Sequence, residues 1–388
     1  MQNFGRVTLA DICDDLVIYR QLEPLDKRLP KVKTAQRRVG LTGNPIPRKQ
    51  EADYAKIALW YAGEAQRVRE VSTPLQELLF IGDTIYNDGQ AYENMRTVSG
   101  WRGSCFIGTD VIDEAPKEQT DEESGLYMAN RWSALGKWAE WLSQQGMSLN
   151  EETVVIVDID KTALGAKGRN DGVIDQARLE GAYETMSALL TQKFDGPAFE
   201  HYYRELNRER YHAVTADNQD YIAYICLVLS TGLIGFDDLI GEINAGQLSS
   251  FDQFIRLVET RMMIRPVNSE FFRQAHDAVI MAVRNDDPTP FKRFRRQEFI
   301  STVKRMGQLA DDTDADVLLL EEITINNELY ELVTWLRKRG CLIICLSDKP
   351  DEASCPHPHV SPDLPPVHRA ETHAVGTSIQ PTLDALGT

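Results

Sequence analysis

The sequence predicts an α/β fold, in which helices sandwich a parallel sheet and a large, mainly helical segment forms a second domain. Three apolar runs rich in β-branched residues and leucine each end in a short loop of oxygen-bearing side chains, at residues 79–88, 154–162 and 342–350. Loops of this kind follow the carboxyl ends of parallel strands, where open α/β sheets place their active sites. Between residues 178 and 338 the pattern is almost entirely helical.

The composition indicates a soluble protein. The chain has 388 residues, 42% of them apolar, which suits one large domain or two moderate ones. It has no apolar run of membrane-spanning length and no signal-peptide-like start, so we expect no membrane partner. Six scattered cysteines fit a reducing, cytoplasmic location. The net charge of −17 makes nucleic acid an unfavourable partner.

One segment departs from this acidic average. Residues 27–49 contain eight basic side chains and no acidic one. The first interpretation is a solvated, loop-rich segment, because three prolines interrupt it. Two alternatives remain open: a flap that faces phosphate near an active site, and a contact surface for nucleic acid.

The first part of the sheet is expected near the amino end of the chain. Residues 49–76 have the pattern of a helix followed by a loop, and an apolar strand at 78–82 then leads to Asp83. A helix at 88–98 and a strand at 104–108 complete a parallel βαβ unit.

The middle of the chain connects this unit to the second motif. Residues 110–126 are acidic and poor in apolar side chains, which predicts an exposed linker. Tryptophan and leucine recur at helical spacing within 127–145, which predicts a packed helix. A strand at 153–158 follows and ends at Asp158.

The helical block precedes the last strands of the sheet. Residues 222–230 have the pattern of a helix buried on most sides. After the block, a helix at 328–339 and strands at 341–346 and 372–379 return to the sheet. The helices expected within the block are 199–214, 218–233, 250–263, 268–283 and 291–306.

The three oxygen-rich loops carry a recognisable set of motifs. The first reads GDTIYND from Gly82 to Asp88, the second reads DIDKT from Asp158 to Thr162, and the third reads SDKP from Ser347. Together they resemble the motifs of the haloacid dehalogenase-like (HAD) phosphohydrolases, whose usual order is DxDxT, Ser or Thr, Lys and GDxxxxD. Here GDxxxxD comes first, so the chain resembles a circularly permuted member of that family.

This resemblance divides the chain into permuted core segments and an inserted cap. The expected parts are 1–110 (first core part), 111–149 (linker and helix), 150–177 (core strand and flap), 178–327 (helical cap) and 328–388 (rest of the core).

The resemblance implies hydrolysis of a phosphate monoester through an aspartyl-phosphate intermediate. It makes Asp158 the nucleophile and Asp160 the general acid and base, which protonates the leaving alcohol and then activates water. Ser347 is expected to hydrogen-bond the transferring phosphoryl group, and Thr162 to fix the loop beside the substrate.

The same resemblance implies a Mg²⁺ cofactor. Mg²⁺ prefers oxygen ligands and neutralises the negative charge of phosphate, which otherwise repels an attacking carboxylate. The ligands implied are Asp158, the backbone carbonyl of Asp160, Asp83 and, directly or through water, Asp88.

The family's phosphate-binding lysine has two candidates in this chain. Lys49 opens the segment RKQEADY, 34 residues before Asp83, whereas Lys56 lies 27 residues before it and inside the expected helix. We favour Lys49. In the glycine-rich flap after the second motif, Arg169 or Lys167 is a candidate substrate contact; the alternative is a pair of flexible, solvent-facing side chains.

A zinc site is a separate possibility, because Cys355, His357 and His359 crowd one proline-rich segment. The spacing Cys-x-His-x-His is uncommon for structural zinc, so loop and core positions are the preferred interpretation.

Taken together, the motifs indicate a Mg²⁺-dependent phosphatase that acts on a small phosphorylated metabolite. Two alternatives stay open: a phosphoryl-transfer mutase, and a catalytically silent module that binds a ligand or RNA. The sequence encodes neither the identity of the substrate nor the oligomeric state in a form that can be read from one chain.

Overall fold

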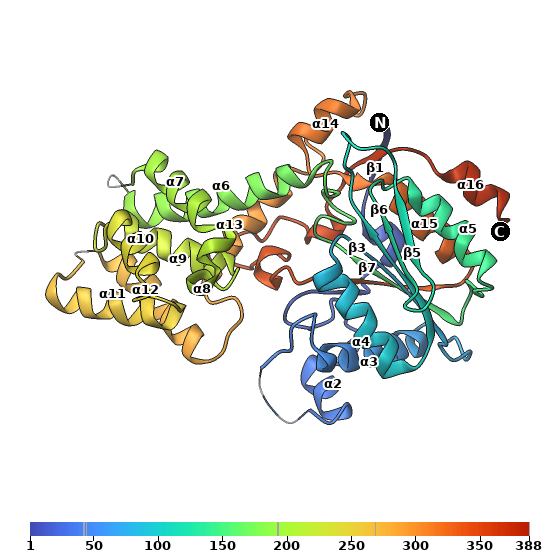
Figure 1. Cartoon of the computed structure of the whole chain (residues 1–388), viewed down its shortest axis with the longest axis horizontal. Coiled ribbons are helices and arrows are strands. Elements are labelled where there is room, and N and C mark those ends of the chain that lie inside the picture. Colours follow the sequence, from blue (N-terminus) through green and yellow to red (C-terminus); the bar gives the residue numbers. More distant parts are fainter. Residues whose placement is uncertain (42, 44, 192–193, 268, 388) are drawn as a thin grey trace. The chain divides into compact units, whose positions relative to one another are not determined.

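The chain forms two compact units in a computed structural model that describes residues 1–41, 43, 45–191, 194–267 and 269–387. The first unit contains Met1–Asp175, Thr302–Cys355 and the residues from Pro365 onward (Figure 1). The second contains Gln176–Ser301 and Pro356–Leu364.

A seven-stranded sheet forms the centre of the first unit. Its strands are fully buried where the sequence is a continuous run of apolar residues, as in the strand that ends at Asp158. All neighbours are parallel except the last pair, β6 and β5. The strands, in spatial order, are β2 (Val17–Ile18), β9 (Leu342–Leu346), β7 (Thr153–Asp158), β3 (Glu77–Gly82), β4 (Arg102–Gly108), β6 (Leu126–Ala129) and β5 (Glu118–Asp121).

The register brings the three motif-bearing loops to one edge. Ile81 of β3 lies opposite Val157 of β7, and Asp158 lies opposite Leu346 of β9. The strand that carries Asp158 is therefore flanked by the strand that leads to Asp83 on one side and the strand that leads to Ser347 on the other. Neighbouring strands are about 4.8 Å apart, so the loops that follow them start side by side.

Helices cover both faces of this sheet (Figure 1). On one face, alternate strand residues such as Leu78, Phe80 and Ile156 pack against helices from residues 32–99. On the other face, Trp138 donates its indole N–H to the Ser104 hydroxyl at 2.9 Å. The first face carries α2 (Val32–Arg38), α3 (Ala52–Val68) and α4 (Gln90–Ser99); the second carries α1 (Ala10–Cys13), α5 (Ala134–Gln144), α15 (Asn327–Lys338) and α16 (Gln380–Ala385).

The strand expected at 372–379 belongs to a separate, three-stranded sheet rather than to the large one. In that sheet β10 (Thr372–Gly376) pairs antiparallel with β1 (Gln2–Val7) and parallel with β8 (Ile325–Asn326). The amino-terminal strand β1 pairs with one edge of β10 and β8 pairs with the other. Neither edge of β10 is therefore left to pair with the large sheet.

The expectation of an exposed linker at 110–126 is also wrong. Residues 118–121 form β5, and β6 begins at Leu126, so the segment extends the large sheet as a hairpin. All four residues of β5 are polar and exposed, as suits an edge strand, and a search for apolar runs overlooks such a strand. The helix expected at 127–145 starts only at Ala134 for the same reason.

The described part of the second unit is mainly helical, and Pro356–Leu364 adds turns without a helix. Residues 222–229 of α9 are all buried, as the sequence predicted, and the other helices surround them (Figure 1). Asn268, where one helix was expected to begin, lies outside the described residues. The helices are α6 (Asp171–Leu190), α7 (Gly196–Leu206), α8 (His212–Thr215), α9 (Gln219–Ser230), α10 (Phe236–Asn244), α11 (Phe251–Ile264), α12 (Glu270–Arg284) and α13 (Lys292–Val303).

The helical unit ends earlier than the cap boundary expected at 327. Residues from Thr302 belong to the first unit, where α14 (Ala315–Glu321) precedes β8. The pairing of β8 with β10 draws this segment back to the first unit. Among the helices of the described chain, none has the length and apolar character needed to cross a membrane.

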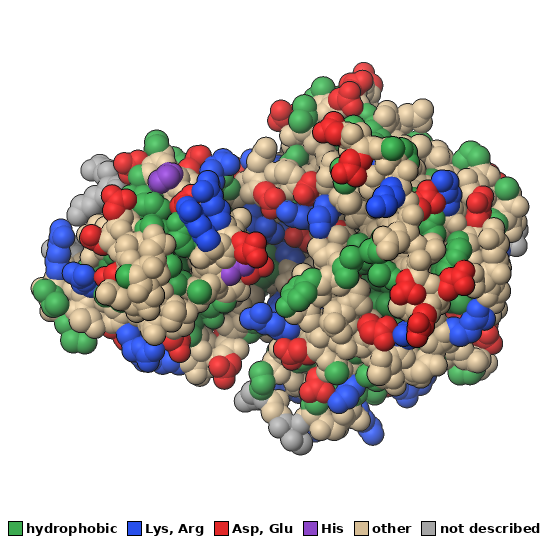
Figure 2. Space-filling view, viewed as in Figure 1, with side chains coloured by type: hydrophobic (Ala, Val, Ile, Leu, Met, Phe, Trp, Pro, Cys, Tyr) green, Lys and Arg blue, Asp and Glu red, His purple; other side chains and the backbone are tan. Residues whose placement is uncertain are grey.

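Charged side chains of both signs are interspersed on the face of each unit that Figure 2 shows. Of the eight basic side chains within 27–49, seven are exposed and Lys49 alone is buried. Residues 42 and 44 of this segment lie outside the part of the chain that the structure describes. The exposure of the seven agrees with a solvated segment, and the burial of Lys49 sets it apart.

Candidate active site

Three carboxylates converge where β3 and β7 end. Asp158 is the last residue of β7, Asp83 directly follows β3, and Asp88 lies one turn further on. One oxygen from each of the three lies within 4.8 Å of the others, and the group is the one set of at least three potential metal-binding side chains found among the described residues. The parallel register thus assembles residues that are 70 positions apart in the sequence.

Lys49 lies at the centre of this acidic cluster. Its Nζ is 2.6 Å from Oδ1 of Asp88 and 2.5 Å from Oδ1 of Asp158, and its side chain is 2% exposed. The other lysine candidate, Lys56, pairs instead with Asp53 at a half-exposed position on α3. The structure therefore brings Lys49 to the carboxylates and leaves Lys56 away from them.

Asp88 organises the loop after β3. The loop forms a short π-helix at Ile85–Gly89, which turns Asp88 back toward the strand end. Its Oδ2 accepts hydrogen bonds from the backbone N–H groups of Asp83 and Thr84, both at 3.0 Å. Its Oδ1 accepts from Lys49, so both oxygens already have partners.

Gly82 makes this turn possible. A Cβ atom at position 82 would lie 2.4 Å from Cβ and Cγ of Asp88, closer than real atoms approach. The glycine of the GDxxxxD motif is thus required by the close approach of the Asp88 side chain to the end of β3.

Burial and mutual repulsion shape the charges of the cluster. Burial raises the pKa of Asp158 well above its usual range, with Asp88 and Asp83 adding to the rise and Lys49 opposing it. Burial, then Asp88, raises the pKa of Asp83 to about 6. Burial by itself would raise the pKa of Asp88 as well, but the charge and hydrogen bond of Lys49 and the two backbone N–H groups outweigh burial and lower this pKa. The cluster is therefore short of positive charge despite Lys49.

Asp160 and Ser347 lie in the neighbouring loops with a second lysine. Nζ of Lys349 is 3.4 Å from Oδ1 of Asp160, and the backbone N–H of Lys349 donates to the Ser347 hydroxyl at 3.1 Å. Ser347 in turn donates its backbone N–H to the carbonyl of Ile18 at 3.0 Å, which ties its loop to β2. Lys349 is 8% exposed and escaped the sequence analysis, although its position two residues after Ser347 was the available signal.

The flap after the second motif divides into two roles. Lys167 reaches the cluster, with its Nζ 3.0 Å from Oδ2 of Asp83. Arg169 does not: its side chain is 3% exposed, its Nε pairs with Asp110 at 2.8 Å, and its two terminal nitrogens pair with Glu328 at 2.9 Å. The geometry assigns Arg169 to holding the flap in place and gives it no contact with the carboxylate cluster.

Thr162 has a local, structural position. Its side chain is fully buried and its carbonyl accepts a hydrogen bond from the Asn326 amide at 3.3 Å. The backbone of Thr162 therefore anchors the loop after β7, while its hydroxyl oxygen is buried without a hydrogen-bond partner among the described residues.

The histidine-rich segment does not assemble a metal site. Cys355, His357 and His359 form no converging group in the described part of the chain. His368 and His373 instead pair with carboxylates, Asp15 and Glu322, both at 2.8 Å.

Comparisons of the chain with sequence models of protein families, with curated proteins and with solved structures found no match. The chemistry of the cluster must therefore be argued from its own geometry. That geometry combines a buried carboxylate held by a lysine, a second carboxylate two residues away, and a hydroxyl on the adjacent strand end.

Proposed function

We propose that this chain is a Mg²⁺-dependent phosphatase of the HAD-like class, in circularly permuted order, that hydrolyses a small phosphate monoester. One observation carries the proposal: Asp158, Asp83, Asp88 and Lys49, from three distant segments, meet at the carboxyl edge of adjacent parallel strands, with Ser347 on the next strand end. An unrelated fold has no reason to gather these particular groups at one edge.

The residues present suit a Mg²⁺ ion. Carboxylate oxygens are its preferred protein ligands, and one oxygen from each of Asp83, Asp88 and Asp158 lies within 4.8 Å of the others. Because both oxygens of Asp88 already accept hydrogen bonds, Asp83 and Asp158 would be the direct carboxylate ligands, and Asp88 would orient the backbone of Asp83 and the side chain of Lys49. When bound, the ion supplies charge neutralisation for the phosphoryl oxygens.

The first chemical step transfers the phosphoryl group to the chain. An oxygen of Asp158 attacks phosphorus and the bond from phosphorus to the ester oxygen breaks, while Asp160 gives its proton to that oxygen. Lys49 and Ser347 stabilise the negative charge of the transferring group.

The second step frees the enzyme. Asp160, now a carboxylate, takes a proton from water, and the water oxygen attacks phosphorus. The bond between phosphorus and Asp158 breaks, which releases phosphate and restores both aspartates. The ion pair of Lys349 with Asp160, 3.4 Å from Nζ to Oδ1, positions this carboxyl group in the loop after β7.

The strand order supports the permuted arrangement. In the HAD pattern the nucleophile strand is central, between the Ser or Thr strand and the GDxxxxD strand, and β9, β7 and β3 have this order. The strand after the GDxxxxD helix lies two places from the nucleophile strand, as β4 does.

Hydrolysis of an aryl phosphate by the full chain, with and without Mg²⁺, tests the proposal. We expect release of phosphate that requires the ion. No turnover with Mg²⁺, on aryl phosphates and on a panel of phosphorylated metabolites, would contradict it and favour a binding module. Phosphate that moves to a second hydroxyl of the substrate instead of to water would identify a mutase.

A further inference from the structure

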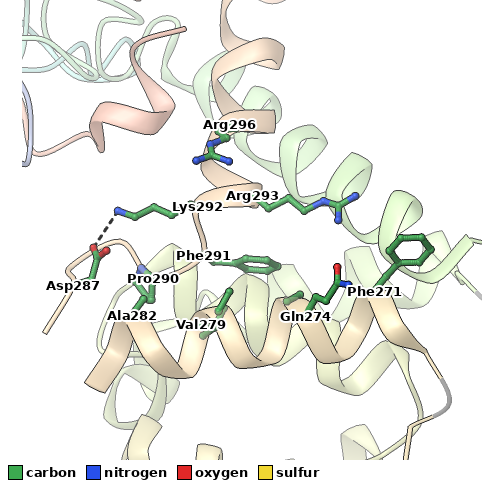
Figure 3. A pocket seen from close by; sticks show the side chains of 12 residues that line it. Phe271, Gln274, Val279, Ala282, Asp287, Pro290, Phe291, Lys292, Arg293 and Arg296 are labelled. Atoms are coloured by element: carbon green, nitrogen blue, oxygen red, sulfur yellow. Dashed lines mark hydrogen bonds and ion pairs between the residues drawn. The ribbon is translucent and has the colours of Figure 1, made fainter. Parts of the chain in front are cut away.

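The second unit contains a cavity of its own. It measures about 290 Å³ and lies between α12 and the start of α13 (Figure 3). Val279, Ala282 and Phe291 form an apolar floor, and Phe271 borders it although its ring is 54% exposed. Such a volume accommodates a group of one or two aromatic rings.

Basic side chains from the first turns of α13 border the same cavity. Lys292 is neutralised locally, because its Nζ is 3.1 Å from Asp287 and 2.6 Å from the Thr289 hydroxyl. The side chains of Arg293 and Arg296 line the same cavity (Figure 3), and neither guanidinium group forms a hydrogen bond or ion pair with a residue that the structure describes. Three bases thus face one acid at this cavity, in a chain whose net charge is −17.

Arg296 carries the stronger signal of the two. Its Nε is buried and has no hydrogen-bond acceptor. A buried donor without an acceptor is unfavourable, so the Nε–H of Arg296 is open to an acceptor that a ligand or water supplies.

The start of α13 is held rigidly. Arg295 donates to Asp220 of α9, Nε to Oδ2 at 2.7 Å, and the backbone N–H of Phe291 donates to the other oxygen of Asp220 at 2.9 Å. Arg295 is thereby occupied in the interior, while its neighbours Arg293 and Arg296 remain at the cavity. The site is preformed, which reduces the entropic cost of binding.

We propose that this cavity is a binding site for an aromatic anion, whose rings occupy the apolar floor and whose carboxylate or phosphate group pairs with Arg293 and Arg296. A guanidinium group binds a carboxylate or a phosphate equally through paired N–H donors, so the site accepts an aromatic ligand with either acidic group. The site lies entirely within the second unit and does not depend on the catalytic proposal.

Binding of 1-naphthoate to the full chain tests this site, with neutral 1-naphthalenemethanol as the matched probe. Calorimetry without Mg²⁺ should show one naphthoate site and at least about tenfold weaker binding of the alcohol, the loss of one charge-assisted pair. Arg293→Gln and Arg296→Gln should each weaken naphthoate and leave the alcohol unchanged. Arg273→Gln, on α12 but paired with Glu270 outside the cavity, should change neither.

Two further measurements separate a ligand site from a structural role. Ala278→Trp should fill the cavity and abolish binding of both probes; Ala278 is exposed, so the fold tolerates the larger ring. Equal affinity for the two probes or unchanged binding in Ala278→Trp would overturn the proposal. Asp158→Asn should bind naphthoate normally, so the outcome is independent of catalysis.

Discussion

At the scale of single residues, the proposed active site is defined by its charge balance, because two lysines contact three carboxylates. Lys49 contacts two of them, and Lys167 the third. Each substitution in the cluster therefore changes the charge balance as well as one contact, and the variants below separate these effects.

Asp158→Asn should abolish phosphatase activity while the fold is retained. The amide has the same shape but cannot attack phosphorus as an anion. Steady-state kinetics on an aryl phosphate measures the loss, and circular dichroism controls for folding. Retention of more than a few per cent of the wild-type rate would assign the nucleophile elsewhere.

Asp160→Asn should slow turnover by about 10²–10⁴-fold, because proton transfer to the leaving group is lost. Aryl phosphates leave with little help from a proton, so they should lose less than alkyl phosphates. The comparison of kcat for the two ester types checks the role. Equal losses would argue that Asp160 acts on the loop and not on the proton.

Asp83→Ala should raise the Mg²⁺ concentration needed for half-maximal activity by about tenfold or more. The reason is the loss of one of two direct carboxylate ligands. Mg²⁺ titration after treatment with EDTA measures the shift. Asp53→Ala, which removes a half-exposed carboxylate paired with Lys56, is the matched control and should leave the titration unchanged.

At the scale of elements, long-range partners decide what a local pattern becomes. β3, β7 and β9 were predictable because each is an uninterrupted apolar run, as a strand buried on both faces must be. β5 was not, because an exposed edge strand of four polar residues has the composition of a loop.

The candidate site follows the same rule. Asp158, Asp83 and Ser347 follow apolar strands, so their approach could be predicted from the sequence. The preference for Lys49 over Lys56 as the phosphate-binding lysine was predicted from a weak resemblance of its flanking sequence to the family's pattern. The path of the chain before α3 is what places Lys49, and not Lys56, beside the carboxylates. Lys349 and the ion pairs of Arg169 depend on partners far away in sequence, which no local pattern records.

A buried ion network joins two helices of the second unit and gives a prediction at this scale. Arg295 is 6% exposed and pairs with Asp220 of α9 and, at 2.6 Å, with Glu298 of α13. Arg295→Met should lower the free energy of unfolding by about 3–5 kcal/mol, because Asp220 is left buried without its cation and Glu298 is left with Arg178, at 3.2 Å.

Urea unfolding followed by circular dichroism measures this loss. Arg284→Met provides the matched control, since Arg284 is 68% exposed and its ion pair with Glu259 should contribute less than about 1 kcal/mol. A similar, small loss in both variants would mean that the network is dispensable.

At the scale of the whole molecule, the first unit is built from both halves of the sequence. β1 pairs with β10, with Gln2 opposite Gly376, so a strand from each end of the sequence lies in the same small sheet. The turn at Gly146, by contrast, is exposed and has a positive φ of 69°.

A rearranged chain that begins at Met147, continues through a short flexible linker to Met1 and ends at Gly146 should fold and be active. Its motifs would then follow the usual HAD order, with every strand pair kept. Phosphatase assays and thermal unfolding compare it with the parent chain. A folded but inactive product would show that the site needs the connection at 146–147, against the permuted interpretation.

The pairing of β1 with β10 and of β2 with β9 also determines when these strand pairs can form during translation. The ribosome makes β1 and β2 first, and their partners more than 300 residues later. At about 5–20 residues per second, the early strands wait on the order of tens of seconds. During that interval β7, already translated, has an open edge on the side where β9 will lie. A nascent chain in this state exposes an unpaired apolar strand edge, which is a template for pairing with a strand of a neighbouring chain.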